Sequence, residues 1–147
     1  MPDFEAANRA RLKTAGLRVT APRLAVLEWV DENPHATADQ IIKAVRLRLG
    51  SVSIQAVYDV LGACEKAGLI RRIENAGHPA QFETRTGDGH HHVVCRRCGC
   101  TQDVDHLVGD TRCVSPPDTA GYVISRSEVI FWGYCADCVA AMPLSAS

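Results

Sequence analysis

The sequence predicts an α+β protein in which a winged helix-turn-helix precedes a smaller part built on strands and a zinc ion. Two observations carry this prediction. Residues 4–67 repeat apolar side chains at helical spacing, and residues 69–83 then alternate around a turn-rich tip as a β-hairpin does. Beyond a short glycine-rich stretch, β-branched and aromatic runs are interleaved with two C-x-x-C pairs, a spacing typical of zinc sites.

Four helices account for most of the first half. Thr20, Thr37 and Ser53 stand where three of them begin, and such residues are good N-caps. Pro22 falls in the first turn of its helix, where a missing N–H costs nothing, and Gly16 ends the first helix. The expected helices span 4–15, 20–33, 37–50 and 53–67.

A hairpin and a hinge complete the first half. Residues 69–73 and 80–83 alternate around 75–79, and helices followed by a hairpin are the order of a winged helix. The next segment, Thr-Gly-Asp-Gly, is short, polar and glycine-rich, which favours a flexible connection. We therefore expect a first domain at 1–85, a hinge at 86–89 and a second domain at 90–147.

The second half is expected to consist mainly of strands. Strand-like runs occur at 90–95 and 100–105, a helix or loop is expected at 106–117, and further strands at 121–125 and 128–134. The last two are too apolar for a lone small sheet. They indicate either a face that meets a second copy of the chain or a single buried core strand.

Two pairs of cysteines predict a structural zinc site. Because C-x-x-C occurs twice, at Cys95 and Cys98 and at Cys135 and Cys138, four thiolates can surround one tetrahedral ion. A site closed by four thiolates has no open position, so it supports the fold and catalyses no hydrolysis. The remaining cysteines are Cys64, Cys100 and Cys113.

His90 and His92 indicate a second metal site. Residues two apart in a strand point to the same face, so both imidazoles can reach one ion while His91 points away. A site with nitrogen and oxygen ligands is a natural sensor, unlike the closed sulfur site.

Composition is that of an ordinary globular protein. The 147 residues include 46% apolar and 22% charged side chains, with a net charge of −1. No signal peptide is recognisable and no apolar run approaches the roughly 18 residues that span a bilayer, so we expect a cytoplasmic protein with no membrane partner. Seven cysteines in that compartment favour metal binding or redox chemistry over disulfides.

Four motifs together resemble the ferric uptake regulator (Fur) family of bacterial metal-dependent repressors, over nearly the whole chain. They are residues 16–23 (GLRVTAPR), 55–61 (QAVYDVL), 90–99 (HHHVVCRRCG) and 132–138 (WGYCADC). Within the family the chain is most similar to the actinobacterial FurA branch, usually encoded beside a catalase-peroxidase gene. The resemblance implies a homodimer whose subunits each carry an N-terminal winged-helix DNA-binding domain and a C-terminal α/β dimerisation and metal-binding domain.

The resemblance also implies a regulatory metal site with ligands from both domains. Three imidazoles and two carboxylates would suit Fe(II), with Mn(II), Ni(II) or Zn(II) able to occupy the site. Taken alone, His35 would be read as a surface histidine, and Glu83 or Asp103 as a solvated charge. The regulatory ligands are expected at His35, Glu83, His90, His92 and Asp103.

A further metal site common in the family is only partly present. The chain has His91 and Asp110 at two of its positions. At two others, Gly89 and Ser127 stand where many relatives have histidine, and Glu128 is the nearest substitute. An extra site at His91, Asp110 and Glu128 is therefore a separate hypothesis.

Contacts with double-stranded DNA are expected from the first domain. Arg18 could enter an A·T-rich minor groove, Gln55 could pair with an adenine edge, and Tyr58 could contact a thymine methyl or a phosphate. Asp59 stands where many relatives have arginine, so the DNA target can differ from theirs. The residues expected to contact DNA are Arg18, Arg23, Ser53, Gln55 and Tyr58.

The favoured function is a dimeric repressor that binds an A·T-rich inverted-repeat operator when its regulatory metal is present and is released by oxidation. Its expected targets are oxidative-stress (catalase-peroxidase) or metal-homeostasis genes, including its own. A non-haem metalloenzyme using His90, His92 and a carboxylate is the alternative, but five ligands would leave few open positions for a substrate. A plain zinc-ribbon module would leave the helices and hairpin unexplained. We expect no enzyme activity and no small-molecule substrate.

Overall fold

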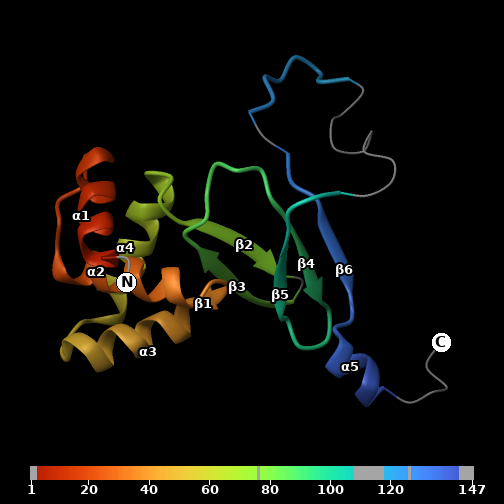
Figure 1. Cartoon of the computed structure of the whole chain (residues 1–147), viewed down its shortest axis with the longest axis horizontal. Helices are drawn as coiled ribbons and strands as arrows, with labels where there is room; N and C mark the ends of the chain where they lie inside the picture. The colour runs from red at the N-terminus through yellow and green to blue at the C-terminus, as the bar shows by residue number, and fades with distance from the viewer. Residues whose placement is uncertain (1–2, 76, 108–117, 126, 143–147) are drawn as a thin grey trace. The chain divides into compact units, whose positions relative to one another are not determined.

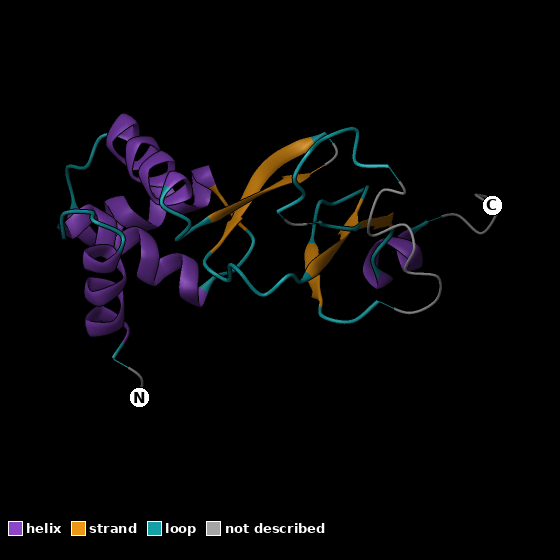
Figure 2. Ribbon diagram, turned by 90° about the horizontal axis from the view of Figure 1, so that it is seen from above, coloured by secondary structure: helices purple, strands orange, loops and turns teal. Residues whose placement is uncertain are grey.

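The computed structural model describes residues 3–75, 77–107, 118–125 and 127–142, and the chain divides into two compact units, Met1–Thr86 and Gly87–Ser147. We call them unit 1 and unit 2. Unit 1 contains four helices and a small sheet, and the described part of unit 2 contains a second small sheet and one short helix (Figures 1 and 2). The predicted α+β class is confirmed.

The helices of unit 1 begin and end close to where the sequence predicts. At the start of the third, the Thr37 hydroxyl accepts from the Gln40 backbone N–H while the Gln40 side chain accepts from the Thr37 N–H, which is a capping box. Thr20 and Ser53 each cap their helix through one side-chain oxygen. The helices are α1 (Phe4–Thr14), α2 (Ala21–Glu32), α3 (Ala38–Leu49) and α4 (Ile54–Lys66).

Three strands form the sheet of unit 1 in the order β1-β3-β2. They are β1 (Ala36–Thr37), β2 (Arg71–Asn75) and β3 (His78–Glu83). The predicted hairpin is confirmed, with a shorter tip than expected because Asn75 already pairs with His78. The two-residue β1 was not predicted, and it pairs antiparallel with β3 so that Ala36 lies opposite Phe82.

One apolar core holds unit 1 together. It takes buried side chains from each of the four helices and from β3, including Leu12, Leu27, Ile41, Leu61 and Phe82. Burying a side chain of this size contributes about 1.5–3 kcal/mol. Unit 1 therefore has enough apolar packing of its own to fix its helices around the hairpin.

Unit 2 contains a sheet of order β5-β4-β6, in which β4 pairs antiparallel with β5 and parallel with β6. The strands are β4 (His91–Cys95), β5 (Thr101–Val104) and β6 (Ile130–Gly133), followed by helix α5 (Ala136–Ala141). The strands expected at 90–95, 100–105 and 128–134 are confirmed with shorter bounds, and α5 was not predicted. None of the described helices of the chain is long and apolar enough to cross a membrane.

The strand predicted at 121–125 is wrong. These residues form a turn and an extended segment without strand pairing among the described residues, and Val123 is 95% exposed. Ala120 and Gly121 both have positive φ, at 50° and 85°, which turns the chain just before the apolar run. Most of the helix or loop expected at 106–117 lies outside the described residues.

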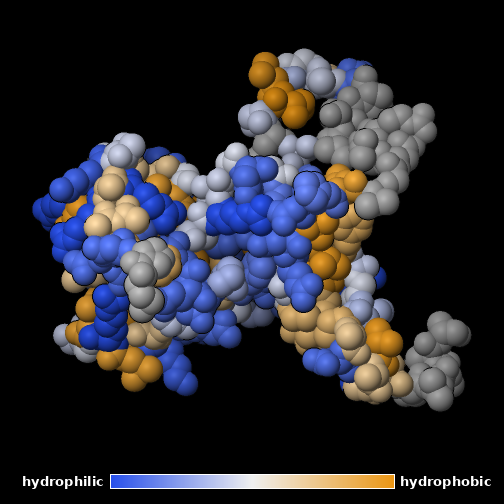
Figure 3. All heavy atoms as spheres, in the orientation of Figure 1, coloured by the Kyte–Doolittle hydropathy of each residue, from blue (hydrophilic) through white to orange (hydrophobic). Residues whose placement is uncertain are grey.

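The apolar side chains of unit 2 are largely on its surface. Val94 and Cys95 are the only buried apolar side chains among its described residues. Phe131, Trp132 and Val139, on β6 and α5, are each more than 40% exposed. Figure 3 shows apolar atoms gathered over β6 and α5.

Candidate metal centres

Four cysteine sulfur atoms converge in unit 2. Each Sγ offers one ligand atom, and all four lie within 4.8 Å of one another: Cys95, Cys98, Cys135 and Cys138. Parallel pairing of β4 with β6 produces this convergence, because Cys95 lies opposite Gly133, just before the second C-x-x-C pair. Thiolates bound tetrahedrally at about 2.3 Å from zinc lie about 3.8 Å apart. The Sγ atoms of Cys98 and Cys135 are 3.8 Å apart, so the donor set fits zinc.

The protonation of the cysteines also fits a bound cation. Backbone N–H groups of Cys98 and Cys135 donate to the sulfur of Cys95 and lower its pKa to about 5. The hydrogen bond with Cys135 raises the pKa of Cys138 to about 12. A divalent cation bound by all four sulfurs replaces the remaining protons and offsets the repulsion between thiolates.

The other described cysteines are poor nucleophiles. Hydrogen bonding to Cys98, together with desolvation, raises the pKa of Cys100 to about 12. Burial in the core of unit 1 raises the pKa of Cys64. Cys113 lies outside the described residues.

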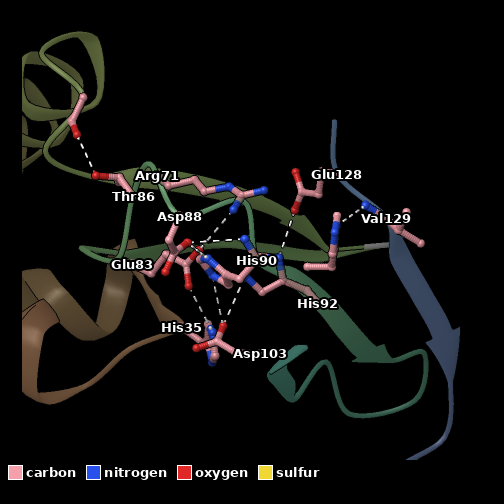
Figure 4. A network of polar contacts seen from close by, with 12 residues as sticks. His35, Arg71, Glu83, Thr86, Asp88, His90, His92, Asp103, Glu128 and Val129 are labelled. Carbon is pink, nitrogen blue, oxygen red and sulfur yellow. Dashed lines mark hydrogen bonds and ion pairs between the residues drawn. The ribbon is translucent and has the colours of Figure 1, made fainter. Parts of the chain in front are cut away.

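Two histidines and an aspartate converge elsewhere in unit 2 (Figure 4). The Nε2 atoms of His90 and His92 each lie 3.3 Å from the same oxygen of Asp103, Oδ1. The register explains this, since His92 is directly opposite Asp103 on β5 and His90 is two residues earlier on the same side. The two imidazole rings meet edge to face with centroids 4.7 Å apart. These three side chains form a compact set of nitrogen and oxygen ligands.

Unit 1 contains a second, smaller set. The Nε2 atom of His35 lies 3.4 Å from Oε2 of Glu83. The pairing of β1 with β3 brings them together, and the backbone N–H of His35 donates to the carbonyl of Phe82 at 2.9 Å. His35 has a φ of 68°, an uncommon conformation for a residue with a Cβ and one that clusters at functional sites.

Arg71 orients the carboxylate of Glu83. It lies opposite Glu83 in the hairpin, and its Nη1 is 3.7 Å from Oε1, the oxygen that does not face His35. Sequence reasoning missed Arg71, although a cross-strand pair of opposite charges is a recognisable pattern once the register of a hairpin is known.

A profile of the Ferric uptake regulator family matches residues 14–113. The chain belongs to this family. It is 52% identical to the Transcriptional regulator FurA of Mycobacterium tuberculosis over 138 residues, which cover 94% of this chain and 91% of that protein. The chain is thus a metal-responsive transcriptional regulator of the ferric uptake regulator family.

Solved structures of ferric uptake regulators share its fold. That of Vibrio cholerae has a TM-score of 0.67 at 30% identity, covering 87% of this chain and 99% of the other. That from Pseudomonas aeruginosa with manganese has a TM-score of 0.66 at 27% identity, covering 88% and 98%.

The extra metal site considered for this ferric uptake regulator homologue stays a prediction. His91 accepts a hydrogen bond at Nδ1 from the backbone N–H of Val129, at 2.8 Å. Glu128 lies with its Oε1 2.9 Å from Nδ1 of His92, the neighbouring histidine, so the described contacts do not bring it to His91. Asp110 lies outside the described residues.

The residues expected to contact DNA lie in unit 1, and two of them project from α4. Gln55 and Tyr58 are exposed, whereas Val57 on the opposite face is buried in the core. The side-chain amide of Gln55 donates to Asp59 Oδ1 at 2.9 Å. Asp59 thus accepts from one of the two N–H groups of the Gln55 amide and leaves the other N–H and the carbonyl oxygen for a base.

The other three expected DNA contacts have structural roles as well. The Ser53 hydroxyl caps α4 by accepting from the backbone N–H of Ala56 at 3.0 Å. Arg23 donates through Nη1 to the carbonyl of Arg18 at 2.7 Å, which braces the segment before α2. Arg18 is exposed, so among these three it is best suited to reach a phosphate or a groove.

Proposed function

We propose that the chain is a metal-activated repressor whose regulatory metal takes ligands from both units at once. The observation that carries the proposal is that each unit presents an incomplete set of metal ligands. Unit 2 offers two imidazole nitrogens around one carboxylate oxygen, and unit 1 offers a histidine paired with a glutamate. The proposed ligands are His35, Glu83, His90, His92 and Asp103.

The ligand chemistry supports an iron-type regulatory metal. Imidazole suits first-row metals of intermediate softness, and carboxylates suit harder ones, so a mixed set accepts Fe(II) and also Mn(II), Ni(II) or Zn(II). The four-cysteine cluster has softer ligands and a closed geometry, so we assign it the structural zinc. Two sites of such different chemistry can be filled by different metals in one chain.

A metal shared by the two units would act as a clamp. Glu83 precedes the hinge by a few residues and His90 follows it, and Gly87 and Gly89 both have positive φ, at 79° and 68°, which favours glycine. With the metal bound, one interdomain angle is fixed. If only about 1% of metal-free dimers have that angle, the apparent affinity for the operator falls about a hundredfold.

The outer surface of unit 2 supports a dimer. β6 is an edge strand of the described sheet, and Phe131 and Trp132 on β6 and Val139 on α5 are exposed. Exposed apolar side chains beside an edge strand of the described sheet are typical of a contact between subunits. A two-fold dimer would present two copies of α4, which predicts an inverted-repeat operator with half-sites one helical turn apart.

The exposed side of α4 and the segment at Arg18 support DNA binding. We assign Gln55 and Tyr58 to the major groove and Arg18 to an A·T-rich minor groove. With one N–H on Asp59, Gln55 still has an N–H and a carbonyl oxygen, which match N7 and N6 of an adenine edge.

The signal that we propose is oxidation of the regulatory metal, which would release the clamp and relieve repression. The raised pKa of Cys64 and Cys100 makes these thiols slower to oxidise than an ordinary cysteine, which favours the metal as the sensor. Targets among oxidative-stress (catalase-peroxidase) or metal-homeostasis genes, including the chain's own gene, fit such a sensor.

A band-shift and footprinting experiment tests this function. Duplex DNA from upstream of the chain's own gene is incubated with zinc-loaded protein, with a chelator too weak to remove the structural zinc, and after adding back each divalent metal. We expect an A·T-rich footprint that requires added metal. Equal binding with and without that metal would contradict metal activation.

Two variants separate the two parts of the proposal. Tyr58→Ala should weaken operator binding at every metal concentration, because it removes a DNA contact. His92→Ala should leave weak metal-independent binding unchanged and abolish stimulation by metal.

A further inference from the structure

Each proposed histidine ligand in unit 2 has a carboxylate on its other ring nitrogen. Nδ1 of His90 lies 2.6 Å from Oδ1 of Asp88, and Nδ1 of His92 lies 2.9 Å from Oε1 of Glu128 (Figure 4). The Asp88 carboxylate also accepts from the backbone N–H of His90 at 3.3 Å. The two carboxylates come from segments far apart in the sequence, yet they make the same contact.

A carboxylate at Nδ1 determines which nitrogen can bind a metal. An ionised carboxylate only accepts, and the carboxylates at Nδ1, at 2.6 and 2.9 Å, are closer than Asp103 is to either Nε2, at 3.3 Å, so the neutral ring keeps its proton on Nδ1 and its lone pair on Nε2. The Nε2 atoms of His90 and His92 are the atoms that converge on Asp103. The carboxylate also increases the basicity of the ring, which strengthens a metal bond at Nε2.

His91, between them, has the opposite arrangement. Its Nδ1 accepts from the backbone N–H of Val129, so its ring proton must be on Nε2 when the ring is neutral. Three consecutive histidines therefore differ in tautomer in a way that matches their predicted roles. The tautomers of His90 and His92 leave Nε2 for a metal, and that of His91 does not.

We propose that Asp88 and Glu128 are positioning residues for the regulatory metal site. They fix the tautomer and the ring orientation of His90 and His92 without binding the metal themselves. This inference rests on the proposed function, since it needs His90 and His92 to be ligands. It gives Glu128 a different role from that in the extra site, and it gives Asp88, which the sequence suggests only as a hinge residue, a part in metal binding.

Metal affinity tests the proposed positioning role of Asp88 and Glu128. Protein with its zinc site filled is titrated with Co(II) against a chromophoric chelator, and zinc content is checked for every variant. Asp88→Ala and Glu128→Ala should each weaken Co(II) binding about 10–100-fold, the usual effect of removing such a partner. Glu128→Gln should recover much of the loss, because its amide oxygen still accepts from Nδ1. Asp118→Ala removes an exposed carboxylate of unit 2 that accepts only locally from Ala120 in the described contacts, and it should have no effect.

The tautomers give a second readout that a merely structural role would not change. Long-range ¹⁵N–¹H NMR spectra of the protein without cobalt, recorded above the pH at which the rings are protonated, should show Nδ1–H for His90 and His92 and Nε2–H for His91. In Glu128→Ala the ring of His92 should shift toward a mixture of tautomers, while His90 keeps its own.

The outcomes distinguish this inference from the proposed function. Unchanged Co(II) affinity in both alanine variants, with binding lost in His92→Ala, would overturn the positioning role and leave the regulatory site standing. Unchanged affinity in His92→Ala would overturn both. Weaker binding in Glu128→Ala with no rescue by Glu128→Gln and an unchanged His92 tautomer would also contradict the inference.

Discussion

The two units are stabilised in different ways. Unit 1 buries leucine, isoleucine and valine from all of its helices, and its polar groups are mostly on its surface. In the described part of unit 2 the pattern differs, because His90, His91 and His92 are buried while most aromatic and aliphatic side chains are exposed. Unit 1 has an apolar core of its own. Under the proposed function, unit 2 takes from metals and a partner subunit the stability that an apolar core would otherwise give.

This difference fits the proposal that most metal ligands of the chain lie in unit 2. A unit stabilised by its own apolar core changes little in stability when a bound metal ion dissociates. A unit stabilised by coordination bonds changes in stability with each metal ion that binds or dissociates. The proposed clamp connects the responsive unit to the stable one through only two side chains of unit 1, His35 and Glu83.

The largest expected effect is loss of the structural zinc. Cys98→Ser leaves three sulfur ligands at a site whose metal contributes on the order of 10 kcal/mol to folding. Unit 2 should unfold and the dimer should dissociate, while the helices of unit 1 remain. Zinc analysis, light scattering and circular dichroism measure the three effects.

Cys100→Ser is the matched control for that variant. Cys100 hydrogen-bonds to Cys98 but is not one of the four converging sulfurs, so its replacement should keep one zinc per subunit and the dimer. Zinc bound as tightly in Cys98→Ser as in Cys100→Ser would refute the assignment of the quartet.

Acid should unfold unit 2 before it unfolds unit 1. The lowered pKa of Cys95 means that its thiolate stabilises folded unit 2 fully above the ordinary thiol pKa of about 9, and progressively less as the pH falls toward 5. Protons then compete with zinc for the same sulfurs. Between pH 7 and pH 4 we expect zinc release and unfolding of unit 2 before the helical signal of unit 1 changes. Simultaneous loss of both signals would show that the units are not independent.

A substitution in the core of unit 1 should destabilise unit 1 and leave the zinc content unchanged. Leu27 is fully buried in unit 1, and Leu27→Ala should lower the free energy of unfolding of that unit by about 2–5 kcal/mol while zinc content stays the same. Leu47 is 82% exposed, so Leu47→Ala should change stability by less than about 0.5 kcal/mol. Denaturant titration measures both, and a loss of zinc in Leu27→Ala at low denaturant would count against the contrast between the units.

The smallest effect concerns DNA affinity. Removing one cation that contacts phosphate reduces the slope of log K against log[salt] by roughly 0.9. Arg18→Ala should show this reduction, and Lys13→Ala, at the exposed end of α1 and assigned no DNA contact, should not. An unchanged slope for Arg18→Ala would remove Arg18 from the proposed DNA surface.

The sequence was most informative where structure is local. Helix bounds followed from caps such as Thr37 and from glycines such as Gly50, because these features act within a few residues. The prediction from sequence failed at 121–125. An apolar β-branched run there suggested a strand, but the preceding turn leaves this run exposed and unpaired among the described residues. The strand β1 was missed because two residues show no periodicity.

The same limit applies to the metal ligands. Spacing alone was enough to place His90 and His92 on one face, since that depends only on the alternation of a strand. Arg71, Asp88 and Glu128 could not be predicted, because their contacts depend on the register of the hairpin, on a loop conformation and on the approach of a distant segment.

The most direct test of the shared regulatory site compares His35→Ala with His90→Ala. The two variants remove one imidazole from unit 1 and one from unit 2, and both leave in place the four cysteines to which we assign the structural zinc. Metal affinity is measured by chelator competition with the zinc site filled. If one ion takes ligands from both units, the variants should lose affinity for the regulatory metal to a similar extent while keeping one zinc per subunit and the dimer. Wild-type affinity in His35→Ala together with loss in His90→Ala would place the regulatory metal in unit 2 alone and contradict the clamp.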